Sequence, residues 1–147
     1  MVVWDFNSAC DNYVESTLTP RRFEMQVNVW FYMLMKDEYF VERLIDRYHE
    51  LRESYLSGDY LAGYINDVVD YLGPAIDRNF EVWGYTFEEF RPLQLDERNP
   101  ADFKKAVRQM KEFIYDCSAW LHEHIDSLLQ CSHELKNKKS NHSPVRW

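Results

Sequence analysis

The sequence predicts a mainly α-helical protein: one multi-helix lobe of about five helices with a short strand at its N-terminus. Apolar residues recur at helical spacing through most of the chain, and capping residues, glycines and prolines divide it into segments of helical length. Hydrophobic residues make up 46% of the 147 residues, enough for one domain with a core. We expect the lobe to span residues 1–132 and residues 133–147 to form a basic, disordered tail.

The charge distribution argues against nucleic-acid binding. The net charge is −8, and residues 133–147 carry four of the basic residues against Glu134 alone, so the body is more acidic still. Such a body repels phosphate backbones. No apolar run approaches 18 residues, so we expect no membrane span. The cysteines number three, and Cys117 and Cys131 lie too far apart along one predicted helix to pair, which favours free thiols.

The N-terminal part of the sequence is predicted to begin with a strand, Val2–Trp4, which is followed directly by an acid, Asp5. Thr19 and Pro20 then have the types of an N-cap and a first helical residue. The helix that they predict has an apolar face made of Phe23, Val27, Trp30, Phe31 and Leu34.

Two further helices are predicted between Asp37 and Leu72. Asp37 has the type of an N-cap, and the helix after it ends at Ser57-Gly58. Its predicted inner face consists of Phe40, Leu44, Tyr48, Leu51 and Tyr55. Asp59 can cap the next helix, whose apolar residues are Leu61, Tyr64, Ile65, Val68, Val69 and Leu72.

A shorter helix follows the Gly73-Pro74 break and ends at Gly84. Residues 86–89, Thr-Phe-Glu-Glu, have the capping-box pattern and predict one or two helical turns as far as Arg91.

The last helix is the clearest element of the sequence. Asn99 is predicted as its N-cap and Pro100 as its first residue. An apolar stripe then continues for about seven turns. Its members are Phe103, Ala106, Val107, Met110, Phe113, Ile114, Cys117, Trp120, Leu121, Ile125 and Leu128.

Two candidate sites on these helices have competing interpretations. His122 and Asp126 are four residues apart, a workable spacing for metal ligands, although a solvated face with His124 packed inward fits the same pattern. Arg78 and Trp83 lie at the end of the fourth helix. They form either a structural anchor, in which Arg78 pairs with a neighbouring acid, or a docking surface for another lobe or protein.

Asp5 is the third candidate. A carboxylate held at the end of a strand is the kind of fixed oxygen ligand that Mg²⁺ needs in phosphoryl transfer, although such an aspartate also commonly caps a turn. The glycine-rich, nucleophile-elbow and zinc-helix signatures of common enzyme classes are missing from the sequence.

Four segments resemble the C-terminal part of the CotH family of atypical protein kinases. Trp4–Tyr13 resembles that family's W-D-[YF]-D-x-x-F-G-N, and Asp37–Val41 with Arg47–Arg52 resembles D-P-x-F…R-W-x-E-L-R. Ala75–Trp83 resembles A-x-x-R-N-F-x-x-W. Val107–Ile114, with Trp120, Leu121 and Ile125, resembles the closing helix V-x-x-[ML]-K-x-[WF]-[IL]…W-[LM]-x-x-x-I. The resemblance covers roughly residues 2–130, in matching order.

The resemblance implies a kinase-like fold of which this chain is the helical C-terminal lobe. It implies that Asp5 is the metal-binding aspartate and that Asn7, a neutral and weaker ligand, stands where the family has a second acid. Cys10 and Asp11 replace the family's Phe-Gly, and Cys117 replaces a common arginine. The intact protein would use Mg²⁺ and ATP to phosphorylate Ser or Thr of a protein, whereas this chain alone would be inactive and bind neither.

The resemblance also implies partners and a location. In the family the ATP-binding lobe and the catalytic loop precede the W-D segment, so the expected partners are an N-terminal kinase lobe and a protein substrate, such as a coat or surface protein. The expected location is the cytoplasm or the spore coat, or outside the cell if a signal sequence lies upstream. The alternative is a non-catalytic helical module that binds a protein through Arg78 and Trp83.

Overall fold

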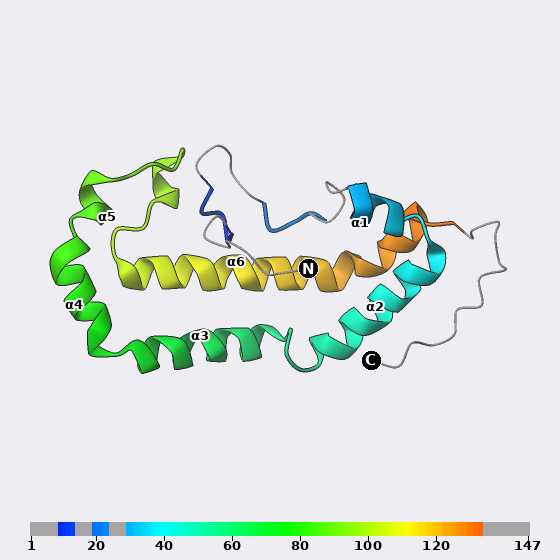
Figure 1. Cartoon of the computed structure of the whole chain (residues 1–147), viewed down its shortest axis with the longest axis horizontal. Helices are drawn as coiled ribbons and strands as arrows, with labels where there is room; N and C mark the ends of the chain where they lie inside the picture. Colours follow the sequence, from blue (N-terminus) through cyan, green and yellow to red (C-terminus); the bar gives the residue numbers. More distant parts are fainter. Residues whose placement is uncertain (1–8, 14–18, 24–28, 134–147) are drawn as a thin grey trace.

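The computed structural model describes residues 9–13, 19–23 and 29–133, and its elements within these ranges are helices (Figure 1). The α-helices are α1 (Val29–Leu34), α2 (Glu38–Arg52), α3 (Gly58–Leu72), α4 (Pro74–Trp83), α5 (Thr86–Glu89) and α6 (Phe103–His124), and the 3-10 helices are η2 (Asp96–Arg98) and η3 (Ile125–Cys131). The predicted mainly α-helical fold is therefore confirmed. The predicted strand Val2–Trp4 lies outside the described residues.

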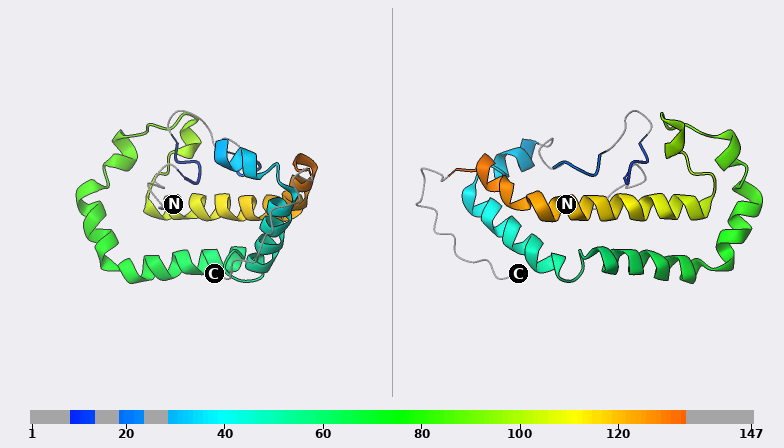
Figure 2. Two further views of the ribbon diagram at one scale, coloured as in Figure 1. Left: turned by 45° about the vertical axis from the view of Figure 1, so that its right-hand side comes forward. Right: turned by 180° about the vertical axis from the view of Figure 1, so that it is seen from behind.

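The two long helices α3 and α6 lie side by side and antiparallel (Figures 1 and 2). The Tyr115 hydroxyl donates to Asp59 Oδ1 at 3.2 Å, and the Lys111 ammonium donates to Asn66 Oδ1 further along the pair. The chain leaves α3 at a sharp corner at Gly73, whose φ of +45° lies in the region that favours glycine. Pro74 then begins α4, as the Gly-Pro break predicts.

The described core lies at the other end of the molecule, where α2 packs on η3. Asp37 caps α2, as predicted, by accepting the N–H of Tyr39 at 3.1 Å. The buried cluster comprises Met35, Val41, Ile45, Ile125 and Leu128. The predicted inner residues Phe40, Leu44 and Tyr48 pack partly against this cluster, whereas Tyr55 is 62% exposed and was wrongly assigned to the inside.

The prediction of a helix beginning at Pro20 is wrong for the residues that can be compared. Residues 19–23 are not helical: residues 20–22 form a bend, and the Thr19 hydroxyl oxygen accepts the N–H of Arg21 at 3.2 Å. Such a local side-chain bond satisfies the backbone without a helix. The described part of helix α1, Val29–Leu34, buries none of its residues, and Trp30 is 81% exposed.

Two predicted caps are also corrected. Ser57, rather than Asp59, caps α3 by accepting the N–H of Tyr60 at 3.1 Å, which frees the Asp59 carboxylate for Tyr115. Thr86 does not cap α5, because its hydroxyl donates to the Trp83 carbonyl at 2.7 Å, and α5 ends at Glu89 instead of reaching Arg91.

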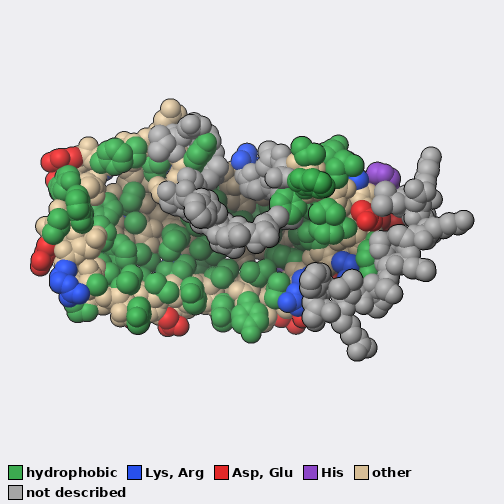
Figure 3. Space-filling view, in the orientation of Figure 1, with side chains coloured by type: hydrophobic (Ala, Val, Ile, Leu, Met, Phe, Trp, Pro, Cys, Tyr) green, Lys and Arg blue, Asp and Glu red, His purple; other side chains and the backbone are tan. Residues whose placement is uncertain are grey.

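The face of the molecule seen in Figure 3 is largely hydrophobic between α3 and α6. Several large apolar side chains stand well exposed, among them Val29, Trp30, Tyr71, Val82 and Phe90. Exposed apolar area of this extent is typical of a surface that contacts another protein or domain. Within the described ranges, no helix is long and apolar enough to cross a membrane.

Candidate functional site

The candidate site forms where residues 9–13 meet the loop between α5 and α6. Arg91 fixes the first half of this loop: its Nε donates to Asp96 Oδ1 at 2.8 Å, and its two terminal nitrogens donate to the carbonyls of Phe87 and Asp96. The ion pair raises the pKa of Arg91 and lowers the pKa of the Asp96 carboxyl. The 3-10 helix η2 follows directly.

Asn99 holds the second half of the loop and does not cap the last helix as predicted. Its side chain is buried, accepts the N–H of Leu93 at 3.0 Å and donates to the Leu93 carbonyl at 2.9 Å. The bond from the Leu93 N–H uses the side-chain oxygen that a cap would need. Asp102 instead caps α6 by accepting the N–H of Lys105 at 2.7 Å. Gln109 Nε2 donates to the Glu97 carbonyl at 2.9 Å and ties the loop to α6.

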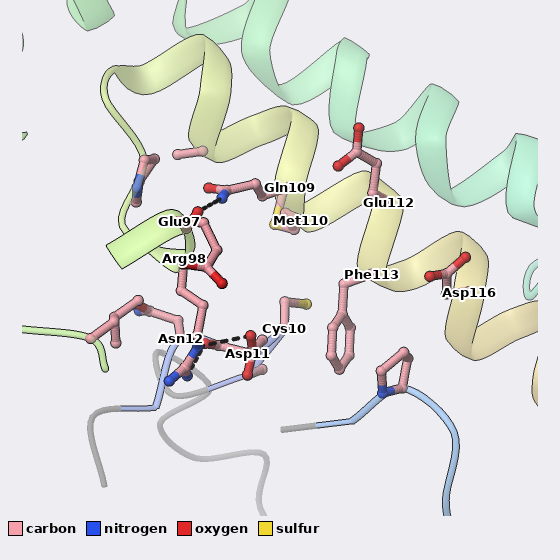
Figure 4. A pocket seen from close by; sticks show the side chains of 15 residues that line it. Cys10, Asp11, Asn12, Glu97, Arg98, Gln109, Met110, Glu112, Phe113 and Asp116 are labelled. Carbon is pink, nitrogen blue, oxygen red and sulfur yellow. Dashed lines mark hydrogen bonds and ion pairs between the residues drawn. The ribbon is translucent and has the colours of Figure 1, made fainter. Parts of the chain in front are cut away.

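Arg98 reaches from this loop to the N-terminal segment, as Figure 4 shows. Its side chain is only 7% exposed, and its Nε donates to Asp11 Oδ2 at 2.9 Å. One terminal nitrogen donates to the carbonyls of Asp11 at 2.7 Å and Tyr13 at 2.9 Å, and the other donates to the Gln94 carbonyl at 3.1 Å. A guanidinium can make such a set because its donors are fixed in one plane.

The turn that Arg98 holds has an unusual backbone. Cys10 and Asp11 have φ values of +53° and +64°, in the left-handed region, where most residues other than glycine are disfavoured. Asp11 stands where the resemblance places a glycine. The aspartate keeps the left-handed conformation, which short polar side chains tolerate best, and adds a carboxylate that pairs with Arg98.

An open cleft of about 760 Å³ lies beside this turn and runs along α6 (Figure 4). Leu93, Met110 and Phe113 supply apolar walls. Its acidic residues are Asp11, Glu97, Glu112 and Asp116. Among its described lining residues the only cation is Arg98, whose guanidinium is bonded to protein oxygens. The described part of the cleft is therefore acidic, and one of its carboxylates, Asp11, is paired with Arg98.

Cys10 lines the cleft, and its thiol is not activated as a nucleophile. Burial raises the pKa of Cys10, and negative charge on Cys117 raises it further. Burial alone raises the pKa of Cys117. All three cysteines are free, as the sequence predicts. The protonated thiols of Cys10 and Cys117 are poor nucleophiles near neutral pH, so neither has the properties of a catalytic cysteine.

The sequence-predicted metal ligands, Asp5 and Asn7, lie outside the described residues, and their role stays a prediction. Arg78 and Trp83 lie on α4, where Arg78 is exposed and Trp83 is 52% exposed. Five residues apart, they project about 140° apart around the helix. Neither lines the cleft. Within the described residues Arg78 makes no ion pair.

The structure brings a third residue to His122 and Asp126, but not as a metal site. His49 on α2 contacts both: its Nε2 lies 2.9 Å from Asp126 Oδ1, and its ring centroid lies 6.2 Å from that of His122. His124 stacks on Trp120 of the apolar stripe with centroids 4.5 Å apart, and its side chain remains 39% exposed. In the described part of the chain, no group of three or more His, Cys, Asp or Glu side chains is arranged to hold a metal ion.

The residues that organise the cleft are ones that sequence reasoning missed. Arg98 and Asp11 are 87 positions apart, and nothing in the pattern of either segment pairs them. A signal did exist for the turn itself, because a family glycine at position 11 predicts a left-handed backbone. Asn99 misled the prediction because asparagine before proline is typical of a helix start.

Comparison with known proteins identifies the family of this chain. The model of the family described as CotH kinase protein matches residues 1–121, which include the N-terminal segment, the loop that clamps it and most of α6. Searches of the curated proteins and of the solved structures found no match. Because the family model spans most of the sequence, this chain belongs to the CotH kinase protein family.

Proposed function

We propose that this chain is the helical C-terminal lobe of a protein kinase that transfers the γ-phosphoryl group of ATP to serine or threonine of a protein. The observation that carries the proposal is the family match over residues 1–121, which contains Asp5. The mainly helical fold agrees with such a lobe.

In this proposal Asp5 would hold Mg²⁺, with Asn7 as a weaker second ligand, and the bound metal would supply positive charge that offsets the charge of the ATP phosphates. The acidic lining of the cleft beside Cys10–Asn12 is compatible with a cation nearby, while its described side chains form no metal site of their own. The same acidity disfavours direct phosphate binding by the described cleft. In this proposal the phosphate-holding groups and the catalytic base belong to an N-terminal kinase lobe, as the resemblance to the family implies. The chain alone is therefore inactive. The protein substrate belongs to the coat or cell surface.

The test compares this chain with a version extended upstream to include the ATP-binding lobe. We expect the extended protein to bind Mg-ATP and phosphorylate a generic protein substrate, and we expect this chain to do neither. Asp5→Ala should abolish both activities in the extended protein. Asn7→Asp should strengthen Mg²⁺ binding, because it supplies the second carboxylate. An extended protein that binds no Mg-ATP, or binds it equally well with Asp5→Ala, would overturn the proposal.

A second candidate function is a non-catalytic helical module that binds a protein through Arg78 and Trp83. The exposure of both side chains on α4 favours it. This module would keep its fold and its partner whether or not ATP is present. Combined Arg78→Ala and Trp83→Ala substitutions should then abolish partner capture without lowering the melting temperature. If the extended protein is an active kinase and these substitutions change nothing, the module hypothesis fails.

A further inference from the structure

We propose that the outward side of α3 is a docking surface for an amphipathic helix of a partner protein, one that carries lysine or arginine beside its apolar ridge. The proposal goes beyond the kinase function and does not depend on it, because none of the described residues that line the cleft belongs to α3. The surface is a row of exposed apolar side chains, here called the α3 stripe: Tyr60, Tyr64, Val68 and Tyr71.

Helical spacing places the α3 stripe away from the side of α3 that packs on α6. Its members follow one another at intervals of four, four and three residues, so they fall within about 80° of the circumference of the helix. The packed side includes Gly58, which lies against the Tyr115 ring. In Figures 1 and 2, α6 runs along one side of α3, and no described helix runs along the other. Tyr64 is 60% exposed and Tyr71 is 90% exposed. Helix α3 is therefore apolar on two sides, and the described fold covers one of them.

The residue types of the α3 stripe suit contact with a protein. A tyrosine offers a large contact area and loses little side-chain entropy on binding, and tyrosines are enriched where the binding energy of an interface is concentrated. The Tyr60 ring is already held, because it meets the Tyr55 ring edge-on with centroids 5.4 Å apart. Gly63 adjoins the stripe, and a Cβ at its position would meet no atom within 4 Å. A glycine inside a helix weakens the helix, and here it leaves room for the close approach of a partner's backbone.

The charge of α3 decides which partner fits. The helix contains Asp59, Asp67 and Asp70, and it contains no lysine or arginine. Asp67 and Asp70 are exposed along one edge of the stripe, and among the described residues neither forms an ion pair. Opposite charges across an interface favour association, and a lysine or arginine can also lie on the face of a tyrosine ring. A second copy of this chain fits poorly, because its α3 would bring the same acids to the contact.

The test uses two synthetic helical peptides of the same length as α3, both with a leucine ridge. One peptide has lysines along the edges of the ridge and the other has glutamates there. Fluorescence anisotropy of the labelled peptides measures their binding to this chain. We expect the lysine peptide to bind about tenfold more tightly than the glutamate peptide or better. Equal affinities, or no binding of either peptide, would overturn the proposal.

Loss of the aromatic rings should weaken this binding. Tyr64→Ser combined with Tyr71→Ser should lower the affinity for the lysine peptide about tenfold or more, without lowering the melting temperature. Tyr85→Ser is the matched control, because Tyr85 is an exposed tyrosine outside the stripe. It should leave the affinity unchanged. If the double variant binds as tightly as the wild type, the stripe is not the docking surface.

A charge exchange tests the acidic edge separately. Asp67→Lys combined with Asp70→Lys should reverse the preference, so that the glutamate peptide binds more tightly than the lysine peptide. Glu42→Lys combined with Asp46→Lys makes the same change in net charge at two exposed positions of α2, and it should keep the original preference. If both variants lose the preference to the same extent, net charge is its cause and the proposal is wrong.

Three further measurements examine other occupants of the stripe. In sedimentation we expect a monomer, and a dimer that Tyr64→Ser with Tyr71→Ser breaks would assign the stripe to a second copy. We expect the upstream-extended protein to bind the lysine peptide as this chain does, and loss of binding there would assign the stripe to the upstream lobe. We expect no binding to phosphatidylcholine vesicles, and vesicle binding that the same double variant abolishes would assign it to a membrane. Each of these contrary results would overturn the proposal.

Discussion

Gly58 lies directly against the ring of Tyr115, so closely that a Cβ at position 58 would stand 2.6 Å from Cε1 and 2.8 Å from Cδ1. This contact sets the separation of α3 and α6 at the first turn of α3. Gly58→Ala should therefore lower the free energy of unfolding by about 1–3 kcal/mol, because the ring must move or the helices must part. Urea unfolding followed by circular dichroism measures the change.

Gly63 provides the matched control in the same helix, since no atom lies within 4 Å of a Cβ placed there. Gly63→Ala should raise the free energy of unfolding by up to about 1 kcal/mol, from helix propensity alone. In a Tyr115→Ala background, Gly58→Ala should lose its penalty. A penalty of unchanged size in that background would show that the ring contact is not its cause.

Val41 is the largest side chain that is fully buried among the described residues. Val41→Ala should destabilise the protein by about 2 kcal/mol, through lost burial of two methyl groups and the cavity that they leave. Val82→Ala, at a position that is 60% exposed on α4, should change the stability by less than about 0.5 kcal/mol. Similar losses for the two variants would contradict the placement of the core between α2 and η3.

Replacement of Asn99 by its isostere aspartate should destabilise the protein. Asn99→Asp keeps the oxygen that accepts from Leu93 N–H but loses the donor to the Leu93 carbonyl and places a negative charge beside it. We expect a loss of about 1–3 kcal/mol, measured by thermal unfolding. Asn66→Asp is the control: Asn66 accepts from the Lys111 ammonium at an exposed site, so its carboxylate should be neutral or slightly stabilising.

The raised pKa values of two thiols predict that the stability of the protein declines at alkaline pH. Burial raises the pKa of Cys10 and Cys117 in the folded protein. Below the unfolded-state value of roughly 8.5, both states keep these protons and stability does not depend on them. Above it, the unfolded chain loses protons that the native protein keeps, so the free energy of unfolding falls until the pH exceeds the folded-state pKa values.

Urea unfolding between pH 7 and 9.5 measures this decline, which should be smaller in the Cys117→Ser variant. Thiol labelling gives a second measurement at pH 7.5. Cys131, which is exposed, should react with a disulfide reagent well before Cys10 and Cys117 do. Equal labelling rates at the three positions would refute the assignment of burial.

The sequence predicted the local features of the fold well where one residue decides the outcome. Asp37 caps α2 and Gly73-Pro74 separates α3 from α4, because these residue types have strong backbone preferences. Gly84 ends α4 as predicted, although its own backbone is in the ordinary helical region. The stripe of α6 was visible because it has helical periodicity. Predicted caps failed where a tertiary partner competed for the side chain, as Leu93 does for Asn99.

The candidate site was much less predictable than the fold. The acids and Arg98 that meet beside Cys10–Asn12 come from three separate segments, and their approach depends on packing rather than on any local pattern. Family resemblance located Asp5 and marked position 11 as unusual, but it gave no indication of which distant residue would bind the turn.

The ion pair between Arg98 and Asp11 joins residues 87 positions apart, and this separation has a consequence for synthesis. A ribosome adds about 5–20 residues per second, so Asp11 waits on the order of ten seconds before its arginine partner is made. During that interval residues 9–13 lack the contact that later fixes their turn, and they are open to chaperones and proteases. The turn is thus made early and completed late.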